Sequence, residues 1–172
     1  QLNLDRAYAL MTFHRPSNVD ENENLKNLVQ ALEKVSEILD CVFPIHPRTK
    51  NNLDNTGFLN RLQLNPRFHI LDPIGYIDFM RLQKDASVIL TDSGGLQEES
   101  TFFGVPCLTV RDNTERPVTI THGTNKLIGT EYANIPNEVE QALSDRITNS
   151  TSPELWDGRA AERIAAVIKN KL

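Results

Sequence analysis

The chain has 172 residues, 39% of them hydrophobic and 24% charged, with a net charge of -5 at pH 7. This length is enough for one domain with a good core, and the composition is typical of globular proteins. The acidic balance argues against a broad basic surface that binds nucleic acid or anionic lipid. We recognise no signal peptide and no apolar stretch of the roughly 20 residues that a membrane helix needs. We therefore expect a cytoplasmic protein without nucleic-acid or membrane contacts.

The cysteines and histidines predict neither a disulfide nor a metal site. Cys41 and Cys107 lie far apart in or beside apolar runs, which is typical of buried free thiols in a reducing compartment. The four histidines form no zinc-binding spacing with one another or with the cysteines. We expect no metal and no cofactor. The polar start at Gln1 indicates a piece excised from a longer protein.

Short apolar runs alternate with helical patterns along the chain. Strands are predicted at residues 7–13, 41–46, 68–73, 87–93, 105–110 and 125–129. Helices are predicted at 20–39, in part of 47–57, and at 76–86, 96–104, 136–145 and 158–171. This alternation predicts an α/β fold, a Rossmann-like parallel sheet of about six strands with helices on both faces. We expect residues 1–172 to form one such domain.

Two helices carry more specific predictions. Asp20 is the expected cap of the first helix, since polar residues with short side chains favour that position. In the helix at 76–86, Ile77 and Met80, with Phe79 or Leu82, are expected to face the core.

Polar residues gather where the predicted strands end, which is where ligands bind in sheets of this type. In strand order they are His14 and Arg15, His46 and Arg48, Asp72, the run from Asp92 to Gly95, and Arg111 with Asp112.

The fourth of these clusters lies in TDSGGLQEES, Thr91 to Ser100. A helix start offers unpaired N–H groups and a positive dipole end, and glycines before it let a phosphate approach the backbone. Ser93 could add a hydroxyl donor, and Glu98 or Glu99 could bind a ribose. The alternative is a tight turn capped by Asp92 or Ser93, and the residues alone leave both interpretations open. Neither a Walker loop nor a G-x-G-x-x-G motif occurs.

Two further segments strengthen the phosphate interpretation. RDNTERP, Arg111 to Pro117, follows the next strand, and its Arg116 could meet a diphosphate or form a salt bridge with Glu98 or Glu99. His14 lies at the end of the first strand, where a lone histidine is more often structural than catalytic. Three such clusters on one sheet edge favour a site for an anionic ligand.

Together these segments resemble the carboxyl-terminal half of the non-hydrolysing UDP-N-acetylglucosamine 2-epimerase family. The matching pieces are TFHRPSNVD, PIHPRT, LDPIGYIDFMRL, ILTDSGGLQEES, GVPCLTVRDNTERP and GTNKLIGT, in this order. The resemblance implies an architecture of the glycosyltransferase-B (GT-B) type, in which two Rossmann-like domains face each other across a cleft. This chain would be the second domain, the amino-terminal domain would be missing, and the full-length protein would be a homodimer.

The resemblance also implies which residues bind UDP. Ser93, Gly94 and Gly95 would hold the diphosphate, Glu99 would hold the ribose, and Arg116 would meet a phosphate.

Five more positions take roles from the same resemblance. Ile74 and Phe79 would bind the uracil, and His14 would be the catalytic residue beside the phosphates and the sugar. Arg15 and His46 match positions implicated in an allosteric or auxiliary site.

Enzymes of this family invert C2 of the sugar by eliminating UDP, which gives a 2-acetamidoglucal, and then adding UDP back. A hydrolysing branch releases free N-acetylmannosamine instead. The carboxylates that move the C2 proton lie in the first domain, so the resemblance implies that this chain alone binds UDP weakly and is inactive. HRPSNVD and HPRT are closer to archaeal members and to epimerases of UDP-diacetamido-uronic sugars. The substrate could therefore be UDP-N-acetylglucosamine or such a relative.

Three other functions compete with this one. A GT-B glycosyltransferase would share the sheet and a glycine-rich corner, although RDNTERP argues against it. A stand-alone nucleotide-binding or signalling module of the receiver type would need an acidic pair after the first strand, where this chain has Phe13-His14-Arg15. A structural domain without a ligand would leave the polar sheet edge unexplained.

Overall fold

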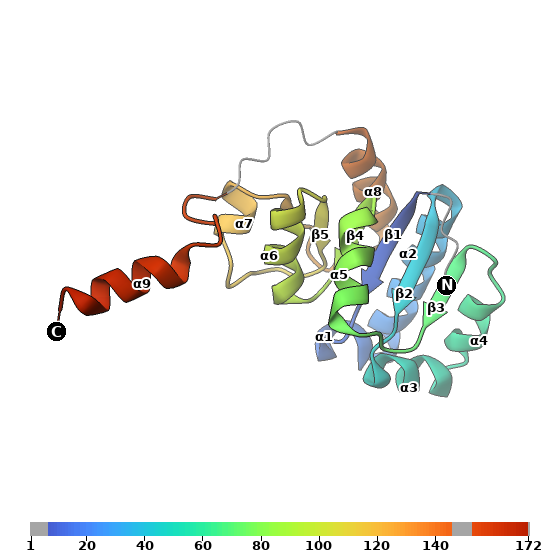
Figure 1. Cartoon of the computed structure of the whole chain (residues 1–172). Coiled ribbons are helices and arrows are strands. Elements are labelled where there is room, and N and C mark those ends of the chain that lie inside the picture. The colour runs from blue at the N-terminus through green and yellow to red at the C-terminus, as the bar shows by residue number, and fades with distance from the viewer. Residues whose placement is uncertain (1–6, 146–152, 172) are drawn as a thin grey trace.

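The computed structural model describes residues 7–145 and 153–171 of the chain. Within them, six strands form one parallel sheet in the order β3-β2-β1-β4-β5-β6 (Figure 1). The strands are β1 (Tyr8–Thr12), β2 (Asp40–Pro44), β3 (Phe68–Leu71), β4 (Val88–Thr91), β5 (Cys107–Thr109) and β6 (Asn125–Leu127). All six predicted strands are confirmed, and so is the Rossmann-like parallel sheet.

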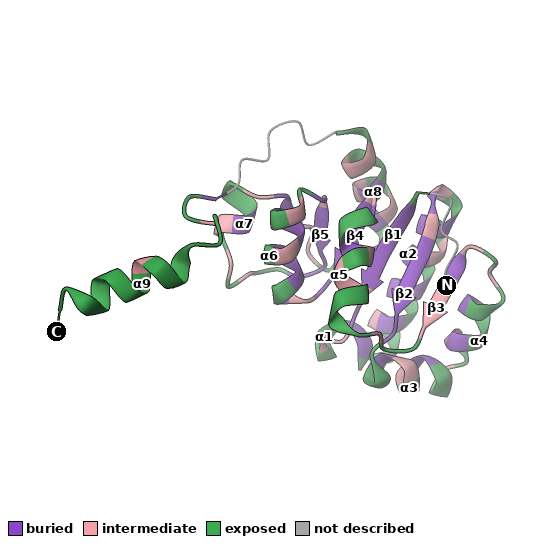
Figure 2. Cartoon of the chain, in the orientation of Figure 1, coloured by how far each residue is buried: buried purple, intermediate pink, exposed green. Residues whose placement is uncertain are grey.

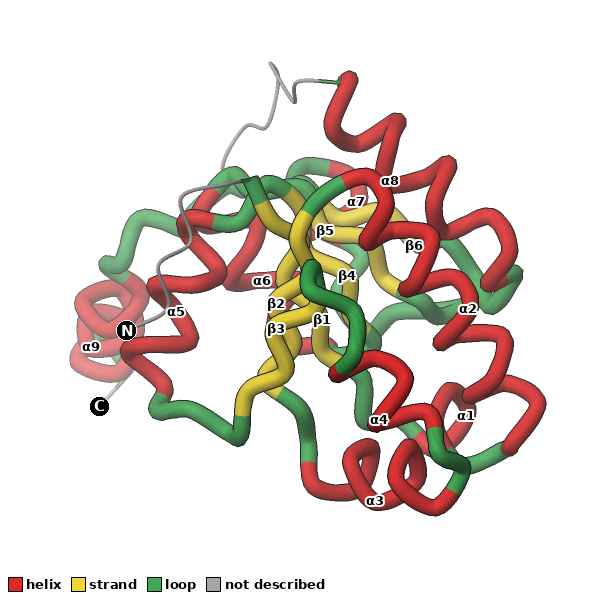
Figure 3. The backbone as a smooth tube through the Cα atoms, turned by 90° about the vertical axis from the view of Figure 1, so that its right-hand side faces the viewer, coloured by secondary structure: helices red, strands yellow, loops and turns green. Residues whose placement is uncertain are grey.

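Helices cover both faces of this sheet, as expected. The described helices are α1 (Pro16–Val19), α2 (Asn22–Ile38), α3 (Pro47–Asn55), α4 (Phe58–Gln63), α5 (Tyr76–Asp85), α6 (Gly94–Phe103), α7 (Val118–Thr121), α8 (Ile135–Ser144) and α9 (Ala160–Lys169), with a 3-10 turn η1 (Tyr132–Asn134). Helix α9 has no buried residue and lies away from the sheet (Figure 1). Figure 3 shows α5 and α6 on one side of the strands and α2 and α8 on the other. None of these described helices is long and apolar enough to cross a membrane.

The core has two parts, one on each face of the sheet. The buried residues are drawn purple in Figure 2 and include most of the central strands. The larger part lies under α2 and α8, with Leu32 and Val139 packed against residues of the strands such as Phe43. The smaller lies under α5 and α6 and contains Leu10 and Leu96. The four inner strands, β2, β1, β4 and β5, are almost wholly buried because both of their faces are covered, which is why they appear in the sequence as continuous apolar runs.

Both cysteines belong to this core. Cys41 and Cys107 are buried free thiols, as predicted. Burial raises the pKa of Cys41 to about 12 and that of Cys107 to about 11. Neither side chain is therefore a reactive thiolate near neutral pH.

The order of the strands places β1 and β4 beside each other at the centre of the sheet. The chain begins at β1, moves outward through β2 and β3, and returns to β4 on the other side of β1. This reversal creates a switch point, the usual ligand position in such sheets. The last residues of the two central strands, Thr12 and Thr91, are paired in register. The segments that begin at Phe13 and Asp92 therefore leave the sheet side by side.

Two predictions about helix starts and numbers are wrong. Asp20 does not cap α2, whose N-cap is Glu21 with no side-chain bond. The Asp20 carboxylate accepts hydrogen bonds from Arg48 and Asn52 of α3 instead. The region after β2 holds two helices, α3 and α4, separated at Gly57, whose positive φ of 74° breaks the helical path.

The prediction for Ile77 is also wrong, since this side chain is 77% exposed. Phe79 and Leu82 pack against the smaller core cluster. Ile77 precedes Phe79 by two residues, which turns it by about 200° around the helix and points it away from the sheet.

Candidate functional site

Asp92 connects the two central strands at the switch point. Its side chain is completely buried. It accepts hydrogen bonds from the backbone N–H groups of His14 and Arg15, at 3.1 and 2.9 Å, and from Asn18 Nδ2 at 3.1 Å. His14 Nδ1 lies 3.1 Å from the same carboxylate, and Arg15 Nε donates to the Asp92 carbonyl. One side chain thus fixes the whole turn after β1.

The charge of Asp92 follows from these contacts. Burial, the largest single influence, raises its pKa, but the hydrogen bonds from His14, Arg15 and Asn18 together hold it below the ordinary value of 3.8. The group is therefore a carboxylate at neutral pH. Because a carboxylate only accepts hydrogen bonds, the proton of a neutral His14 ring lies on Nδ1. Nε2 is then left with a free lone pair.

A cavity of about 250 Å³ lies beside this network, between the ends of β1, β2 and β3. It brings together five of the residues singled out from the sequence, namely His14, His46, Ile74, Phe79 and Ser93. The remaining lining residues are mostly apolar and include Pro44, Ile45, Pro73 and Leu96. Such a cavity suits a flat group with a largely apolar face and a few polar atoms at its rim.

His46 lines the cavity, whereas Arg15 does not. The rings of His46 and His14 lie 5.7 Å apart, tilted by 37°. His46 Nδ1 accepts a hydrogen bond from the backbone N–H of Arg48 at the start of α3. Arg15 is engaged with Asp92 and does not line the cavity.

The first turn of α6 has the features expected of an anion site. The helix begins at Gly94, earlier than predicted, with Ser93 at the N-cap position. The Ser93 side chain makes no capping bond within the described part of the chain, so its hydroxyl can serve a ligand. Gly95 is exposed, and a Cβ placed there would meet nothing within 4 Å. The helix start is therefore open to an approaching group.

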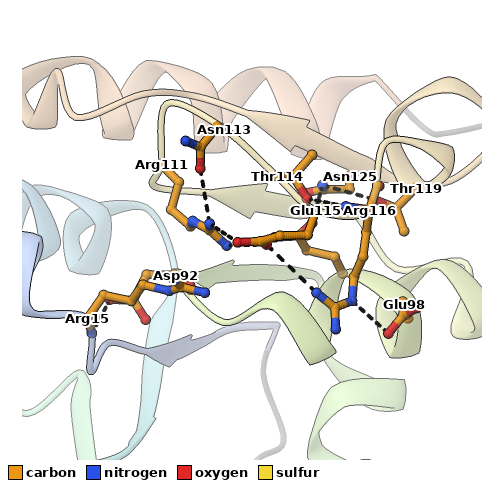
Figure 4. A network of polar contacts seen from close by, with 11 residues as sticks. Arg15, Asp92, Glu98, Arg111, Asn113, Thr114, Glu115, Arg116, Thr119 and Asn125 are labelled. Atoms are coloured by element: carbon orange, nitrogen blue, oxygen red, sulfur yellow. Dashed lines mark hydrogen bonds and ion pairs between the residues drawn. The ribbon is translucent and has the colours of Figure 1, made fainter.

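Arg116 lies against this open turn (Figure 4). A Cβ on Gly94 would come within 2.6 Å of Arg116 Nη1, so the missing side chain is what lets the guanidinium rest there. Arg116 Nε donates to Glu98 Oε2 at 2.8 Å. The predicted salt bridge between Arg116 and Glu98 is confirmed, and the guanidinium also lies at the first turn of α6, so that its contact with a phosphate stays a prediction. Its bond to Glu98 raises the pKa of Arg116, which keeps the group charged.

The other side chains of the 111–117 segment hold each other. Arg111, only 7% exposed, donates two hydrogen bonds to Glu115 and one to Asn113. The hydrogen bonding from Arg111 lowers the pKa of Glu115 to about 2. Thr114 donates to Gln97 Oε1 of α6 at 2.5 Å and accepts from the backbone N–H of Arg116. The hydrogen bonds of residues 111–117 thus fix the position of Arg116, while Arg111 is bonded within the segment itself. We call this segment the bracket.

The chain resembles known proteins over nearly its whole length. A sequence model of the family described as UDP-N-acetylglucosamine 2-epimerase matches residues 1–169. The chain belongs to this family. It is 42% identical over 167 residues to the UDP-N-acetylglucosamine 2-epimerase of Methanocaldococcus jannaschii, covering 96% of this chain and 45% of that protein. The chain thus spans about half the length of the curated relatives it matches.

Solved structures of the family share the fold. A crystal structure of the Methanocaldococcus jannaschii enzyme in complex with UDP-GlcNAc and UDP has a TM-score of 0.85 and 41% identity, covering 95% of this chain and 45% of that one. The glycosyltransferase SnogD from Streptomyces nogalater, at 11% identity and a TM-score of 0.51, shares the fold alone.

A second family activity is represented among the relatives. The UDP-2,3-diacetamido-2,3-dideoxy-D-glucuronate 2-epimerase of Pseudomonas aeruginosa is 36% identical over 161 residues, covering 92% of this chain and 43% of that protein.

The remaining site residue taken from the family resemblance, Glu99, is held by α5. Tyr76 Oη donates to Glu99 Oε1 at 3.2 Å, and Gln83 Nε2 donates to Oε2 at 2.6 Å. The charge of Glu99 and this hydrogen bond raise the pKa of Tyr76.

Sequence reasoning missed three groups that support the family residues. The sequence placed Asp92 in the polar cluster after the fourth strand and suggested it as a helix cap, but did not predict that it fixes the turn after β1, although its place directly after a buried strand was a usable signal. The sequence signal for Gln83 was weaker: it lies four residues after Phe79 and therefore on the core-facing side of α5. Gln97, which accepts from Thr114 and Asn125, had none.

Proposed function

We propose that this chain is the carboxyl-terminal, UDP-binding domain of an enzyme that interconverts UDP-N-acetylglucosamine and UDP-N-acetylmannosamine. The reaction would proceed by elimination and re-addition of UDP. The observation that carries the proposal is the guanidinium of Arg116 lying against Gly94, next to the open backbone at Gly95. This arrangement offers a fixed positive charge and unpaired N–H groups at one place, which is what a diphosphate requires.

The same geometry gives the proposed reaction a physical basis. Breaking the bond between C1 of the sugar and the phosphate oxygen leaves an additional negative charge on UDP. A helix start and an arginine already in position stabilise that charge without reorganising during the reaction. They would also retain UDP until it adds back on the other configuration of C2. In this scheme Ser93, Gly94 and Gly95 hold the diphosphate together with Arg116.

The remaining family residues would complete the nucleotide site. The cavity beside Ile74 and Phe79 would take the uracil, and Glu99 would bind the ribose. His14 would face the phosphates and the sugar, with Nε2 free to exchange a proton because Asp92 holds Nδ1. Arg15 and His46 would belong to an auxiliary or allosteric site.

The proposal extends to the whole enzyme. A second, amino-terminal domain would close a cleft over the sheet edge and supply the carboxylates that move the C2 proton. The full-length enzyme would be a cytoplasmic homodimer of GT-B-like architecture. This chain alone would turn over no substrate, because the proton-transfer groups would be absent.

A related substrate is the second candidate. The 36% identity to the UDP-2,3-diacetamido-2,3-dideoxy-D-glucuronate 2-epimerase of Pseudomonas aeruginosa supports a modified uronic sugar on the same nucleotide. A hydrolysing epimerase would use the same site. A glycosyltransferase is less supported, because the likeness to SnogD extends to the fold alone.

Titration with UDP tests the proposed site. We expect millimolar UDP to shift the NMR signals of residues 93–99 and of Phe79, and Arg116→Ala to weaken binding about tenfold or more. Arg61→Ala is the matched control, because it removes an arginine of α4 that is paired with Glu33. A wild-type chain without any response to millimolar UDP would contradict the proposal.

A further inference from the structure

Gln83 is an unusual residue for its position in α5. Its side chain is completely buried, and it belongs to the face on which Phe79 and Leu82 pack against the smaller core cluster. Its Oε1 has no hydrogen-bond partner within the described residues. Burying an amide with an unpaired acceptor lowers stability, so packing alone favours an apolar side chain here. The polar contact that Gln83 does make therefore calls for an explanation.

That contact is with a carboxylate placed at the candidate site. Gln83 Nε2 donates to Glu99 Oε2 at 2.6 Å. Since a carboxylate only accepts, the NH₂ end of the amide must be the end that faces Glu99. The other carboxylate oxygen accepts from Tyr76 Oη at 3.2 Å. Each oxygen of Glu99 is thus held by one donor from α5.

The two donors differ in how firmly they are held. Tyr76 is 61% exposed at the first position of α5 and can turn aside when a ligand arrives. Gln83 is completely buried and bonded to Glu99 of α6, and its side chain cannot turn aside in this way. The fixed bond is therefore the one from Gln83, and it determines the orientation of the Glu99 carboxylate.

We propose that Gln83 is a positioning residue that holds Glu99 toward the ribose of the nucleotide and gives the site its preference for ribose over deoxyribose. This inference rests on the proposed function, because it takes UDP as the ligand. A carboxylate fixed before binding loses little rotamer freedom when it accepts bonds from ribose hydroxyls. A nucleotide without those hydroxyls leaves the desolvated carboxylate partly unpaired, which penalises it.

The test compares UDP with 2′,3′-dideoxy-UDP on the wild-type chain and on Gln83→Met, by calorimetry. Methionine keeps the volume of the buried side chain and suits its apolar surroundings, but removes the donor. We expect the wild type to prefer UDP by about tenfold or more and Gln83→Met to prefer it by about threefold or less. Affinity for the dideoxy nucleotide should change by less than about twofold, because that ligand makes no use of Glu99.

A control separates positioning from a general loss of stability. Val139→Ala truncates a completely buried side chain of α8, away from Glu99, and should leave the preference for UDP unchanged. If Gln83→Met weakens both nucleotides equally, its role is structural and the inference is overturned. Should Gln83→Met fail to fold, Tyr76→Phe removes the other donor to Glu99 from an exposed position, and the preference for UDP should persist because Gln83 still holds the carboxylate. A preference that falls to about threefold or less in Tyr76→Phe would show that Tyr76 sets it and would then overturn the inference.

The outcomes also separate this inference from the proposed function. UDP binding to the wild type with a preference that Gln83→Met leaves intact overturns the positioning role alone. No UDP binding to the wild type overturns both.

Discussion

The first turn of α6 and the 111–117 segment lie against each other but use their polar groups in opposite ways. In the segment, Arg111, Glu115 and Thr114 are bonded to one another or to α6. At the first turn of α6, the Ser93 hydroxyl makes no capping bond and the space above Gly95 is open. One region is internally satisfied, whereas the other presents its donors outward.

This difference shows how a candidate site can hold a charged side chain rigidly and still leave hydrogen-bond donors free for a ligand. A long arginine side chain loses considerable freedom when it is fixed on a ligand, and that cost reduces affinity. In this chain the bracket of the 111–117 segment and Glu98 fix Arg116 before any ligand arrives. The open helix start then supplies the directional donors. Variants that act on one region and not the other can test this division.

The largest effect is expected from Asp92→Asn, because Asp92 fixes the turn after β1 next to the first turn of α6. Asparagine presents NH₂ where a carboxylate oxygen accepts bonds, so the donors of His14, Arg15 and Asn18 lose partners. We expect the free energy of unfolding in urea to fall by about 2–4 kcal/mol. Asp54→Asn, at an exposed position of α3, is the control and should change it by less than about 0.5 kcal/mol. Equal effects of the two variants would show that the Asp92 network contributes nothing special.

The same carboxylate predicts a dependence on pH. The pKa of Asp92 in the folded chain lies below its ordinary value of 3.8, so its contribution to stability is present above that value. The contribution is lost as the pH falls through the folded pKa. The stability difference between the wild type and Asp92→Asn should be constant between about pH 7 and pH 5 and should shrink below about pH 4. Urea titrations at pH 7, 5, 4 and 3 measure it, and a difference that shrinks first between pH 7 and 5 would point to another group.

Substitutions at two adjacent glycines test the first turn of α6 and the position of Arg116 by different routes. Gly95→Ala adds a methyl group where nothing lies within 4 Å, so the fold should tolerate it. Its helix propensity could raise stability by up to about 1 kcal/mol. The methyl group would nevertheless occupy the space proposed for the diphosphate, and we expect UDP affinity to fall about tenfold. Gly95→Ala with unchanged UDP affinity would place the diphosphate elsewhere.

Gly94→Ala should act by a different route. The added Cβ would come within 2.6 Å of Arg116 Nη1 and push the guanidinium off the helix start. UDP affinity should therefore fall about as much as in Arg116→Ala, and the double variant should add little to either single change. Additive losses in this double-mutant cycle would mean that Gly94 and Arg116 act independently.

The contrast between these regions also explains what the sequence could predict. The strands were predictable because a parallel sheet covered on both faces requires continuous apolar runs. The polar cluster of the site was predictable because strand ends converge at one edge, and the resemblance then suggested a role for each residue. Neither signal contains contacts between helices. The bonds from Gln83 to Glu99 and from Thr114 to Gln97 depend on how α5 and the 111–117 segment pack against α6.

The prediction that Ile77 faces the core was wrong for a related reason. Its helix, α5, contains several apolar residues, and spacing alone allows more than one of them to face inward. The packing against α6 and the sheet selects Phe79 and Leu82, and only the assembled fold shows that choice.

The smallest predicted effect distinguishes the two regions most directly. Because the Ser93 hydroxyl makes no capping bond, Ser93→Ala should leave the urea midpoint unchanged. It should weaken UDP binding by about threefold to tenfold, the net value of one typical hydrogen bond. Thr114→Val is the matched change in the bracket, and it removes the bonds to Gln97 and to the backbone of Arg116. It should lower both stability and affinity, because in the bracket the same bonds stabilise the fold and place the charge. If Ser93→Ala also lowered stability, the first turn of α6 would be a structural cap, and its hydroxyl would not be reserved for a ligand.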